Sequence, residues 1–204
     1  MKNAAVIQAA GSGSRFHSSQ YKLLSPVDGV PMIFRTIEPV LQAGFDDVVV
    51  VIGAHADEMR EALVKYPVRI IENPDWEKGQ STSLSVGVHA IKETSDRACL
   101  LLGDQPFLKA GTLRDLLTES DQYPNQIIVP FYNEKRGNPI VVPSIFYDQL
   151  LELTKGDIGG KKLLQKVGFH KRNTEDSGII RDVDTVEELI KYKTGGQGDC
   201  LSRR

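Results

Sequence analysis

The chain has 204 residues, of which 40% are hydrophobic and 25% are charged, and its formal net charge is −2. These values are typical of one globular domain with a real core, and they exclude a strongly basic nucleic-acid-binding protein. No apolar run approaches the ~18 residues of a membrane span, and Cys99 and Cys200 form no metal or disulfide pattern. The N-terminal residues lead directly into an apolar run, so we expect a cytoplasmic protein without a signal peptide, bound to neither nucleic acid nor membrane.

Strand and helix patterns alternate along the chain. Nearly continuous apolar runs predict strands over residues 4–8, 48–52, 68–72, 98–102 and 127–130. Amphipathic patterns predict helices over residues 32–43, 57–65, 81–92, 108–119, 144–153, 161–167 and 186–192. Strands that are apolar on both faces are typical of parallel sheets covered by helices. The alternation therefore predicts an α/β fold with a doubly wound, mostly parallel sheet.

No internal repeat or linker divides the chain. We expect a single domain over residues 1–193 and a mobile, glycine-rich tail over residues 194–204. Residues 137–143 read GNPIVVP and predict one more strand. The proline near each end of this segment favours an edge position in the sheet, because proline cannot donate a ladder hydrogen bond.

The first predicted strand runs into a loop with very little side-chain bulk. Residues 9–24 read AAGSGSRFHSSQYKLL, and their glycines can take positive φ and let a ligand approach the backbone. Successive N–H groups can then turn toward an anion. Arg15 and Lys22 follow, and a guanidinium beside a mobile ammonium suits a polyphosphate. The alternative is an ordinary flexible surface loop.

The spacing of this loop matches neither of two well-known phosphate-binding motifs. The P-loop and the dinucleotide fingerprint each require a glycine at the sixth position from Gly11, where this chain has Phe16. The second strand ends in Gly53-Ala54-His55, which offers no carboxylate for a ribose hydroxyl. A nicotinamide cofactor, and an oxidoreductase that uses one, are therefore disfavoured.

Asp104 lies just beyond the predicted strand at residues 98–102. In doubly wound sheets, ligands bind beyond the carboxyl ends of the strands, so Asp104 and the glycine loop can share one ligand. A carboxylate that faces phosphates suits Mg²⁺, which takes one or two protein carboxylates together with water and phosphate oxygens. The alternative is a turn or cap aspartate before Pro106.

Residues 182–185, DVDT, offer a second carboxylate before the last predicted helix. We expect a short strand after Ile179 and Ile180, in which alternation puts Asp182 and Asp184 on one face. Either carboxylate can reach the metal. Asp184 has the alternative role of capping the helix that follows.

The only tryptophan, Trp76, lies in the segment NPDWEKGQSTSL at residues 73–84. The segment follows the predicted strand at residues 68–72, so it belongs to the same edge of the sheet. Gly79, Gln80 and the hydroxyl groups that follow can line a pocket for a base and a ribose. The simpler interpretation is an ordinary loop that caps the next helix.

Together these segments resemble the MobA-like nucleotidyltransferases, and within them the molybdenum cofactor cytidylyltransferase branch with its PucB-type accessory proteins of purine catabolism. The resemblance covers residues 3–192 and rests on AAGSGSRF with YKLL, NPDWEKGQSTSL, LLGDQPFL, RGNPIVV, GDIGGKKLL and DVDT. It implies a Rossmann-like fold of the nucleotide-diphospho-sugar transferase type. It also implies Mg²⁺-dependent transfer of a nucleotidyl group from an NTP, here CTP, to the terminal phosphate of molybdopterin, with release of pyrophosphate.

The resemblance also implies roles for particular residues. The nucleotide would be bound by Ala9, Ala10, Gly11, Ser12, Gly13, Ser14, Arg15, Lys22, Gly79, Gln80, Ser81 and Ser83. Within this set Arg15 would hold the β/γ end and Lys22 the α-phosphate, and both would be catalytic together with Asp104. Asp104 and Asp184 would bind Mg²⁺. The acceptor side would include Asn138, Gly159 and Gly160.

Two positions favour cytidylyl over guanylyl transfer. Ala10 stands where the guanylyl branch tends to have glycine, and Gln105 stands where that branch usually has another residue. The chain also departs from the family pattern. Gln8 replaces a frequent leucine, Phe16 a frequent methionine and Asn138 a frequent histidine.

Two other functions share these residues. One is a nucleotidyltransferase of the same fold that acts on a sugar phosphate or another small phosphate. The other is a non-catalytic chaperone that hands finished cofactor to a molybdenum hydroxylase such as xanthine dehydrogenase, with which we expect transient contact. The presence of Lys22, Asp104 and Asp184 favours the enzyme, because an ionised acceptor phosphate needs charge neutralisation and positioning rather than a general base. The four scattered histidines receive no role.

Overall fold

The computed structural model describes residues 1–14, 16, 21–154 and 159–194. Its main sheet has the strand order β10-β7-β9-β6-β1-β4-β5, with β8 paired to β7. The strands are β1 (Asn3–Ala9), β4 (Asp47–Ile52), β5 (Arg69–Glu72), β6 (Arg97–Leu102), β7 (Ile128–Tyr132), β8 (Lys135–Arg136), β9 (Ile140–Pro143) and β10 (His170–Asn173). A separate small hairpin joins β2 (Pro26–Val27) to β3 (Val30–Pro31).

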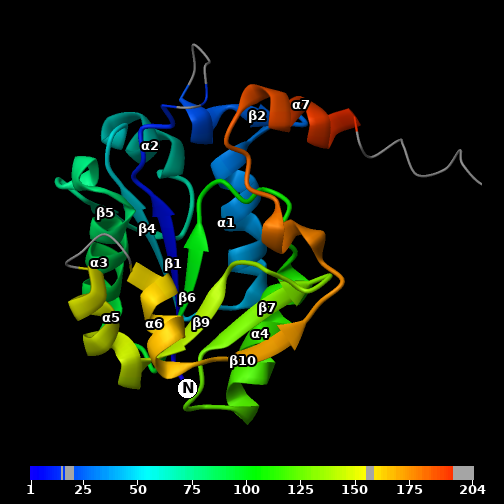
Figure 1. The fold of residues 1–204 in the computed structure, drawn as a ribbon. Coiled ribbons are helices and arrows are strands. Elements are labelled where there is room, and N and C mark those ends of the chain that lie inside the picture. Colours follow the sequence, from blue (N-terminus) through cyan, green and yellow to red (C-terminus); the bar gives the residue numbers. More distant parts are fainter. Residues whose placement is uncertain (15, 17–20, 155–158, 195–204) are drawn as a thin grey trace, which may run out of the picture.

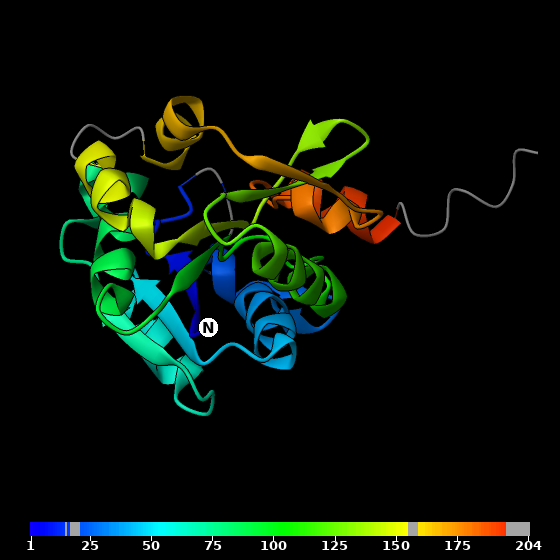
Figure 2. The ribbon, with the colours of Figure 1, turned by 90° about the horizontal axis from the view of Figure 1, so that it is seen from below.

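Helices cover both faces of this sheet, as Figures 1 and 2 show. The α-helices are α1 (Met32–Ala43), α2 (Ala56–Leu63), α3 (Gln80–Ile91), α4 (Ala110–Gln122), α5 (Tyr147–Thr154), α6 (Gly159–Val167) and α7 (Val186–Thr194). Short 3₁₀ helices are η1 (Lys22–Leu24), η2 (Trp76–Lys78), η3 (Ser144–Phe146) and η4 (Ser177–Ile180). Among the described residues, no helix combines the length and the apolar character needed to cross a lipid bilayer.

The pairing confirms the predicted α/β class. β1 lies at the centre and pairs in parallel with β4 and with β6, and β5 pairs in parallel with β4. β9 is antiparallel to both of its neighbours. The sheet is therefore mixed but mostly parallel, and the carboxyl ends of β1, β4, β5 and β6 meet at one edge.

Alternation along β1 divides the apolar side chains between two cores. Ala5 and Ile7 face the core that α1, α2 and α4 cover, whereas Ala4 and Val6 face the core under α3, α5 and α6. Helix α3 comes very close to the strand, because a Cβ on Gly87 would lie 2.3 Å from Val6 Cγ1. This close approach holds α3 directly against the face of β1.

Two predictions about the C-terminal half are wrong. β9 does not lie at an edge of the sheet but between β6 and β7. Pro139 precedes the strand and Pro143 ends it, so the three residues between them still supply ladder hydrogen bonds. The expected short strand before α7 is instead the 3₁₀ helix η4 followed by residues without regular structure.

The domain prediction rests on the sequence alone. Helix α7 extends to Thr194, one residue into the expected tail, and residues 195–204 lie outside the described part of the chain. Strand β10 was not predicted, because its sequence HKRN is polar and alternates between half-buried and exposed positions at the sheet edge.

Candidate functional site

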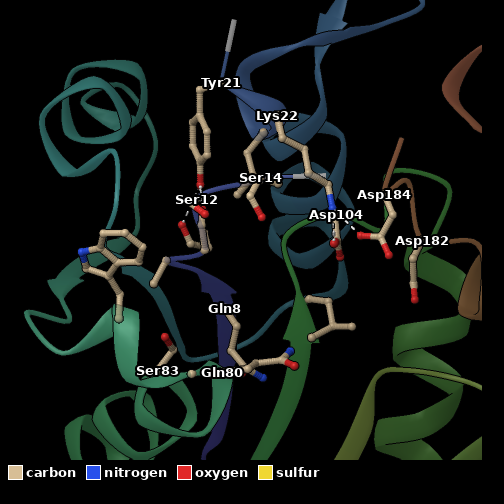
Figure 3. A pocket seen from close by; sticks show the side chains of 18 of the residues that line it. Gln8, Ser12, Ser14, Tyr21, Lys22, Gln80, Ser83, Asp104, Asp182 and Asp184 are labelled. Atoms are coloured by element: carbon tan, nitrogen blue, oxygen red, sulfur yellow. Dashed lines mark hydrogen bonds and ion pairs between the residues drawn. The ribbon is translucent and has the colours of Figure 1, made fainter. Parts of the chain in front are cut away.

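A cavity of about 640 Å³ opens at the carboxyl edge of the sheet, a volume that suits a small-molecule ligand. Figure 3 shows it between the loop after β1, the start of α3 and the segment before α7. The lining residues are Gln8, Ala9, Ala10, Gly11, Ser12, Gly13, Ser14, Tyr21, Lys22, Leu23, Trp76, Glu77, Gly79, Gln80, Ser83, Leu102, Asp104, Asp182 and Asp184. Most of the residues predicted for nucleotide and metal binding are therefore brought together.

One ammonium group joins two carboxylates at the upper end of this pocket in Figure 3. Lys22 Nζ lies 2.7 Å from Asp104 Oδ2 and 2.9 Å from Asp184 Oδ1. The Lys22 side chain is only 8% exposed, while those of Asp104 and Asp184 are 23% and 31% exposed. Desolvation makes such a buried ion pair a weak source of stability, so the cluster is better explained by binding or chemistry.

The loop after β1 packs directly on the stem of Lys22. Gly13 has a φ of +66°, and a Cβ there would lie 2.7 Å from Lys22 Cβ, so this position requires glycine. Figure 3 shows Ser12 and Ser14 beside Tyr21 and Lys22, above the end of β1. The loop and the cation are therefore positioned as one unit.

Tyr21 supports the loop from behind, and our sequence analysis gave it no role. Its hydroxyl donates to Gly11 O at 2.8 Å and lies 3.2 Å from Ala9 O. Its ring stacks on His55 with 4.0 Å between the ring centroids. Burial raises the pKa of the Tyr21 hydroxyl well above its usual range, so the donor stays protonated. The sequence feature that could have indicated this role is an aromatic residue directly before Lys22.

Asp182 lines the pocket together with Lys22, Asp104 and Asp184. Its carboxylate is held in place by a buried side chain, that of Gln105. Gln105 Nε2 donates to Asp182 Oδ1 at 2.6 Å and to Ile179 O at 3.3 Å. Burial raises the pKa of Asp182, and the Asp104 carboxylate adds to this effect while the bond from Gln105 opposes it. Gln105 itself is buried and is absent from the described pocket lining, so it acts on the site through Asp182.

Thr185 and Glu188 form a capping box at the start of α7. Glu188 Oε2 accepts hydrogen bonds from the backbone N–H groups of Asp184 and Thr185, at 2.7 and 3.1 Å. Thr185 Oγ1 in turn accepts from Glu188 N at 3.1 Å. This reciprocal capping box leaves the Asp184 carboxylate directed at Lys22.

The other end of the pocket is formed by η2 and the start of α3. Trp76 is brought against the loop after β1 by Gly53, where a Cβ would lie 2.7 Å from Trp76 Cβ and 2.8 Å from Ala10 O. Asn73 Nδ2 donates to Thr82 Oγ1 and to Ser83 Oγ at 2.9 and 3.0 Å. These contacts fix the helix start, a role for Asn73 that our sequence analysis missed.

Some predicted site residues are not among the described residues that line the pocket. Ser81 is buried, and the described pocket lining includes its neighbours Gln80 and Ser83 but not Ser81 itself. Asn138 donates its backbone N–H to Ile179 O, and neither it nor Gly159 and Gly160 at the start of α6 belong to the described lining. Arg15 lies outside the described residues.

The chain is similar to proteins of one family over most of its length. Residues 5–173 match the model of the MobA-like NTP transferase domain. The chain is 29% identical over 195 residues to nicotine blue oxidoreductase of Paenarthrobacter nicotinovorans, which covers 91% of this chain and 94% of that protein. It is 27% identical to bifunctional protein GlmU of Brevibacillus brevis over 186 residues, which span 89% of this chain but only 36% of GlmU.

Solved structures agree with this assignment. A nucleotidyl transferase from Methanothermobacter thermautotroptrophicus has a TM-score of 0.78 at 26% identity, covering 94% of this chain and 95% of that one. A manganese complex of Rv0371C from Mycobacterium tuberculosis H37Rv has a TM-score of 0.76 at 24% identity, covering 94% and 97%, and speaks for the fold alone. With its fold of the nucleotide-diphospho-sugar transferase type, the chain therefore belongs to the MobA-like NTP transferase family and is a nucleotidyltransferase.

Proposed function

We propose that this protein is a cytoplasmic, Mg²⁺-dependent cytidylyltransferase that transfers CMP from CTP to the terminal phosphate of a molybdopterin-type acceptor. The observation that carries the proposal is the placement of Lys22 between Asp104 and Asp184, beside a glycine loop and at one end of a nucleotide-sized pocket. This arrangement suits a complex of a metal ion with a triphosphate, because the ammonium can bind phosphate oxygens and the carboxylates can bind the metal ion.

The carboxylates fit a hard divalent cation. Oxygens of Asp104 and Asp184 both lie within 2.9 Å of one ammonium, so they converge on a site that already holds positive charge. Two carboxylates suit Mg²⁺, which completes its shell with water and phosphate oxygens and would neutralise charge on the triphosphate. Asp182 is held next to these two by Gln105.

The reaction needs little from the protein beyond positioning and charge. An oxygen of the acceptor phosphate forms a bond to the α-phosphorus of CTP, and the bond between that phosphorus and the bridging oxygen to the β-phosphate breaks. Pyrophosphate leaves with this electron pair, and the acceptor oxygen is already ionised, so no general base is required. Lys22 would hold the α-phosphate and Arg15 the β/γ end, and the loop N–H groups would donate to the phosphate oxygens.

The choice of CTP and of the acceptor comes from the family resemblance. Ala10 lines the pocket and stands where the guanylyl branch tends to have glycine. The product would serve a molybdenum hydroxylase, such as one of purine catabolism, through a transient contact. Asn138, Gly159 and Gly160 remain the proposed acceptor side.

A turnover assay tests both choices. The purified protein is incubated with Mg²⁺, molybdenum cofactor and each NTP in turn, and pyrophosphate and the dinucleotide product are measured. We expect kcat/KM for CTP to exceed that for GTP at least about tenfold, a difference of ~1.4 kcal/mol. Equal kcat/KM values for CTP and GTP would refute the preference for CTP and leave only the assignment as a nucleotidyltransferase. The same assay with sugar phosphates as acceptors tests the alternative that the protein transfers a nucleotidyl group to a sugar phosphate.

The similarity to nicotine blue oxidoreductase provides a second candidate, an oxidoreductase. Strand β4 ends at Ile52 and is followed by Gly53, so the described residues place no carboxylate there for the ribose of a nicotinamide cofactor. Oxidation of NADH or NADPH by the purified protein in the presence of a quinoid dye, without pyrophosphate release, would favour this candidate over nucleotidyl transfer.

A further inference from the structure

Gln8 has a buried oxygen that no group of the described chain satisfies. Its Oε1 atom is shielded from solvent and makes no hydrogen bond with any described residue. A buried amide oxygen without a donor costs about 1–3 kcal/mol, so such groups in native proteins call for an explanation. Gln8 also lines the pocket, so its oxygen meets a ligand once the carboxamide turns toward the cavity.

The surroundings of Gln8 on β1 offer no structural reason for a carboxamide, because the neighbouring residues of the strand are apolar. Side chains alternate along β1, so Gln8 lies on the same face as Ala4 and Val6, toward the core under α3. Leu102 occupies the same face of the neighbouring strand and is the register partner of Gln8. An aliphatic residue would complete this face, yet the chain has a carboxamide.

The pocket has two chemically different ends. In Figure 3, Lys22 and Asp104 lie at the upper end, whereas Gln8, Gln80 and Ser83 lie at the lower end. The upper end carries the charges that suit a triphosphate and its metal. The lower end carries these carboxamide and hydroxyl groups, and Leu102 lies beside Gln8 as its register partner. Helix η2 adds Trp76 and the carboxylate of Glu77 to the pocket lining. Neutral donors and acceptors next to apolar surface suit the edge and faces of a nucleobase.

We propose that Gln8 is a specificity-determining residue whose carboxamide oxygen accepts a hydrogen bond from the exocyclic amino group of the base. This inference rests on the proposed nucleotide site. Cytosine presents an amino donor beside a ring-nitrogen acceptor, and one carboxamide can pair with both groups. A ligand that supplies this donor satisfies the otherwise unpaired oxygen, and a ligand that lacks it leaves the desolvation cost in place.

The test compares CTP with the triphosphate of pyrimidin-2-one riboside, which lacks only the 4-amino group. Trp76 is the only tryptophan and lines the pocket, so its fluorescence reports binding without turnover or acceptor. In the presence of Mg²⁺, we expect the wild-type protein to bind CTP about threefold to tenfold more tightly than the analogue, the worth of one neutral hydrogen bond. Gln8→Leu should bind the two nucleotides equally.

Controls separate this role from a structural one. Gln42→Leu, an exposed position on α1, should keep the wild-type ratio. Gln8→Met, which keeps the unbranched shape, replaces Gln8→Leu if the leucine variant fails to fold. Removal of an unsatisfied amide should leave the Tm of the unliganded protein unchanged or raise it. A wild-type ratio retained in a folded Gln8 variant would overturn the inference and leave the proposed function intact.

Failure of the proposed function has a different signature. If calorimetry and Trp76 fluorescence both show that the wild-type protein binds no nucleoside triphosphate, the nucleotide site itself is refuted and Gln8 has no base to contact. If CTP binds but the analogue binds equally well to the wild-type protein, only the contact from Gln8 to the amino group is refuted.

Discussion

Lys22 and Asp104 form an ion pair in the pocket, with 2.7 Å between Lys22 Nζ and Asp104 Oδ2, although 82 positions separate them in the chain. Lys22 lies in η1, just after the glycine loop, and Asp104 lies beyond the end of β6. Asp184 shares the same ammonium. Removal of any one of the three therefore leaves a partly buried charge with one partner fewer.

Replacement of Asp104 by asparagine should abolish activity without unfolding the protein. Asp104→Asn keeps the size of the side chain but removes the charge that a divalent cation needs, and Lys22 keeps its bond to Asp184. We expect turnover to fall at least ~10²-fold, measured as pyrophosphate release, while the melting curve remains cooperative. Asp148→Asn is the matched control, because that side chain is 80% exposed. Near-normal turnover in Asp104→Asn would show that the carboxylate is structural.

Replacement of Lys22 by alanine should lower kcat more than it weakens nucleotide binding. An ammonium beside the α-phosphate interacts most strongly when charge redistributes in the transition state. We expect a loss of ~10²–10³ in kcat with a smaller change in KM, measured by steady-state kinetics. Lys171→Ala, which removes an exposed ion pair with Glu134, serves as the control.

The same Lys22 variant separates the enzyme from a chaperone. If Lys22→Ala still activates a recipient molybdenum hydroxylase from supplied cofactor while pyrophosphate release is lost, transfer is not the main activity. If both are lost together, the enzymatic proposal is supported. Both quantities are measured on one preparation of the variant.

Replacement of Tyr21 by phenylalanine should loosen the phosphate loop. The variant keeps the stacked ring on His55 but loses the hydroxyl that donates to Gly11 O. One lost hydrogen bond to a positioned loop predicts a KM for CTP raised about threefold to tenfold, with a smaller change in kcat. Tyr66→Phe, whose hydroxyl lies 3.4 Å from Glu38 on the surface, should leave KM unchanged. An equal KM in both variants would contradict this role of Tyr21.

Tyr147 should make the protein less stable at high pH. Burial raises the pKa of Tyr147 to about 12, from an ordinary value near 10. Between these values the unfolded chain releases the proton and the folded chain keeps it, so the free energy of unfolding falls as pH rises. Tyr147→Phe should lessen this fall by at most about 2–3 kcal/mol between pH 10 and pH 12. Urea denaturation at several pH values measures the slopes, and identical slopes would contradict the prediction.

The arrangement of helices and strands could be predicted from local patterns. Helix α1 has the predicted bounds, because an amphipathic run begins after Pro31 and stops at Gly44, which takes a φ of 84°. Strands β1, β4 and β6 are apolar on both faces, which reveals a buried parallel sheet from the sequence alone. The place of β9 could not be predicted, because sheet order depends on pairing between distant segments.

For the candidate site too, part could be predicted from the sequence and part could not. The sequence by itself determined which groups are available: a glycine loop, Lys22, Asp104 just after a strand, and two more aspartates before the last helix. Only the tertiary structure decided that the Lys22 ammonium bridges Asp104 and Asp184. It also decided that Gln105 holds Asp182, and that the described pocket lining does not include Ser81. Composition and periodicity are local properties of the chain. The direction of each side chain depends instead on helix phase, strand register and contacts across as many as 162 positions.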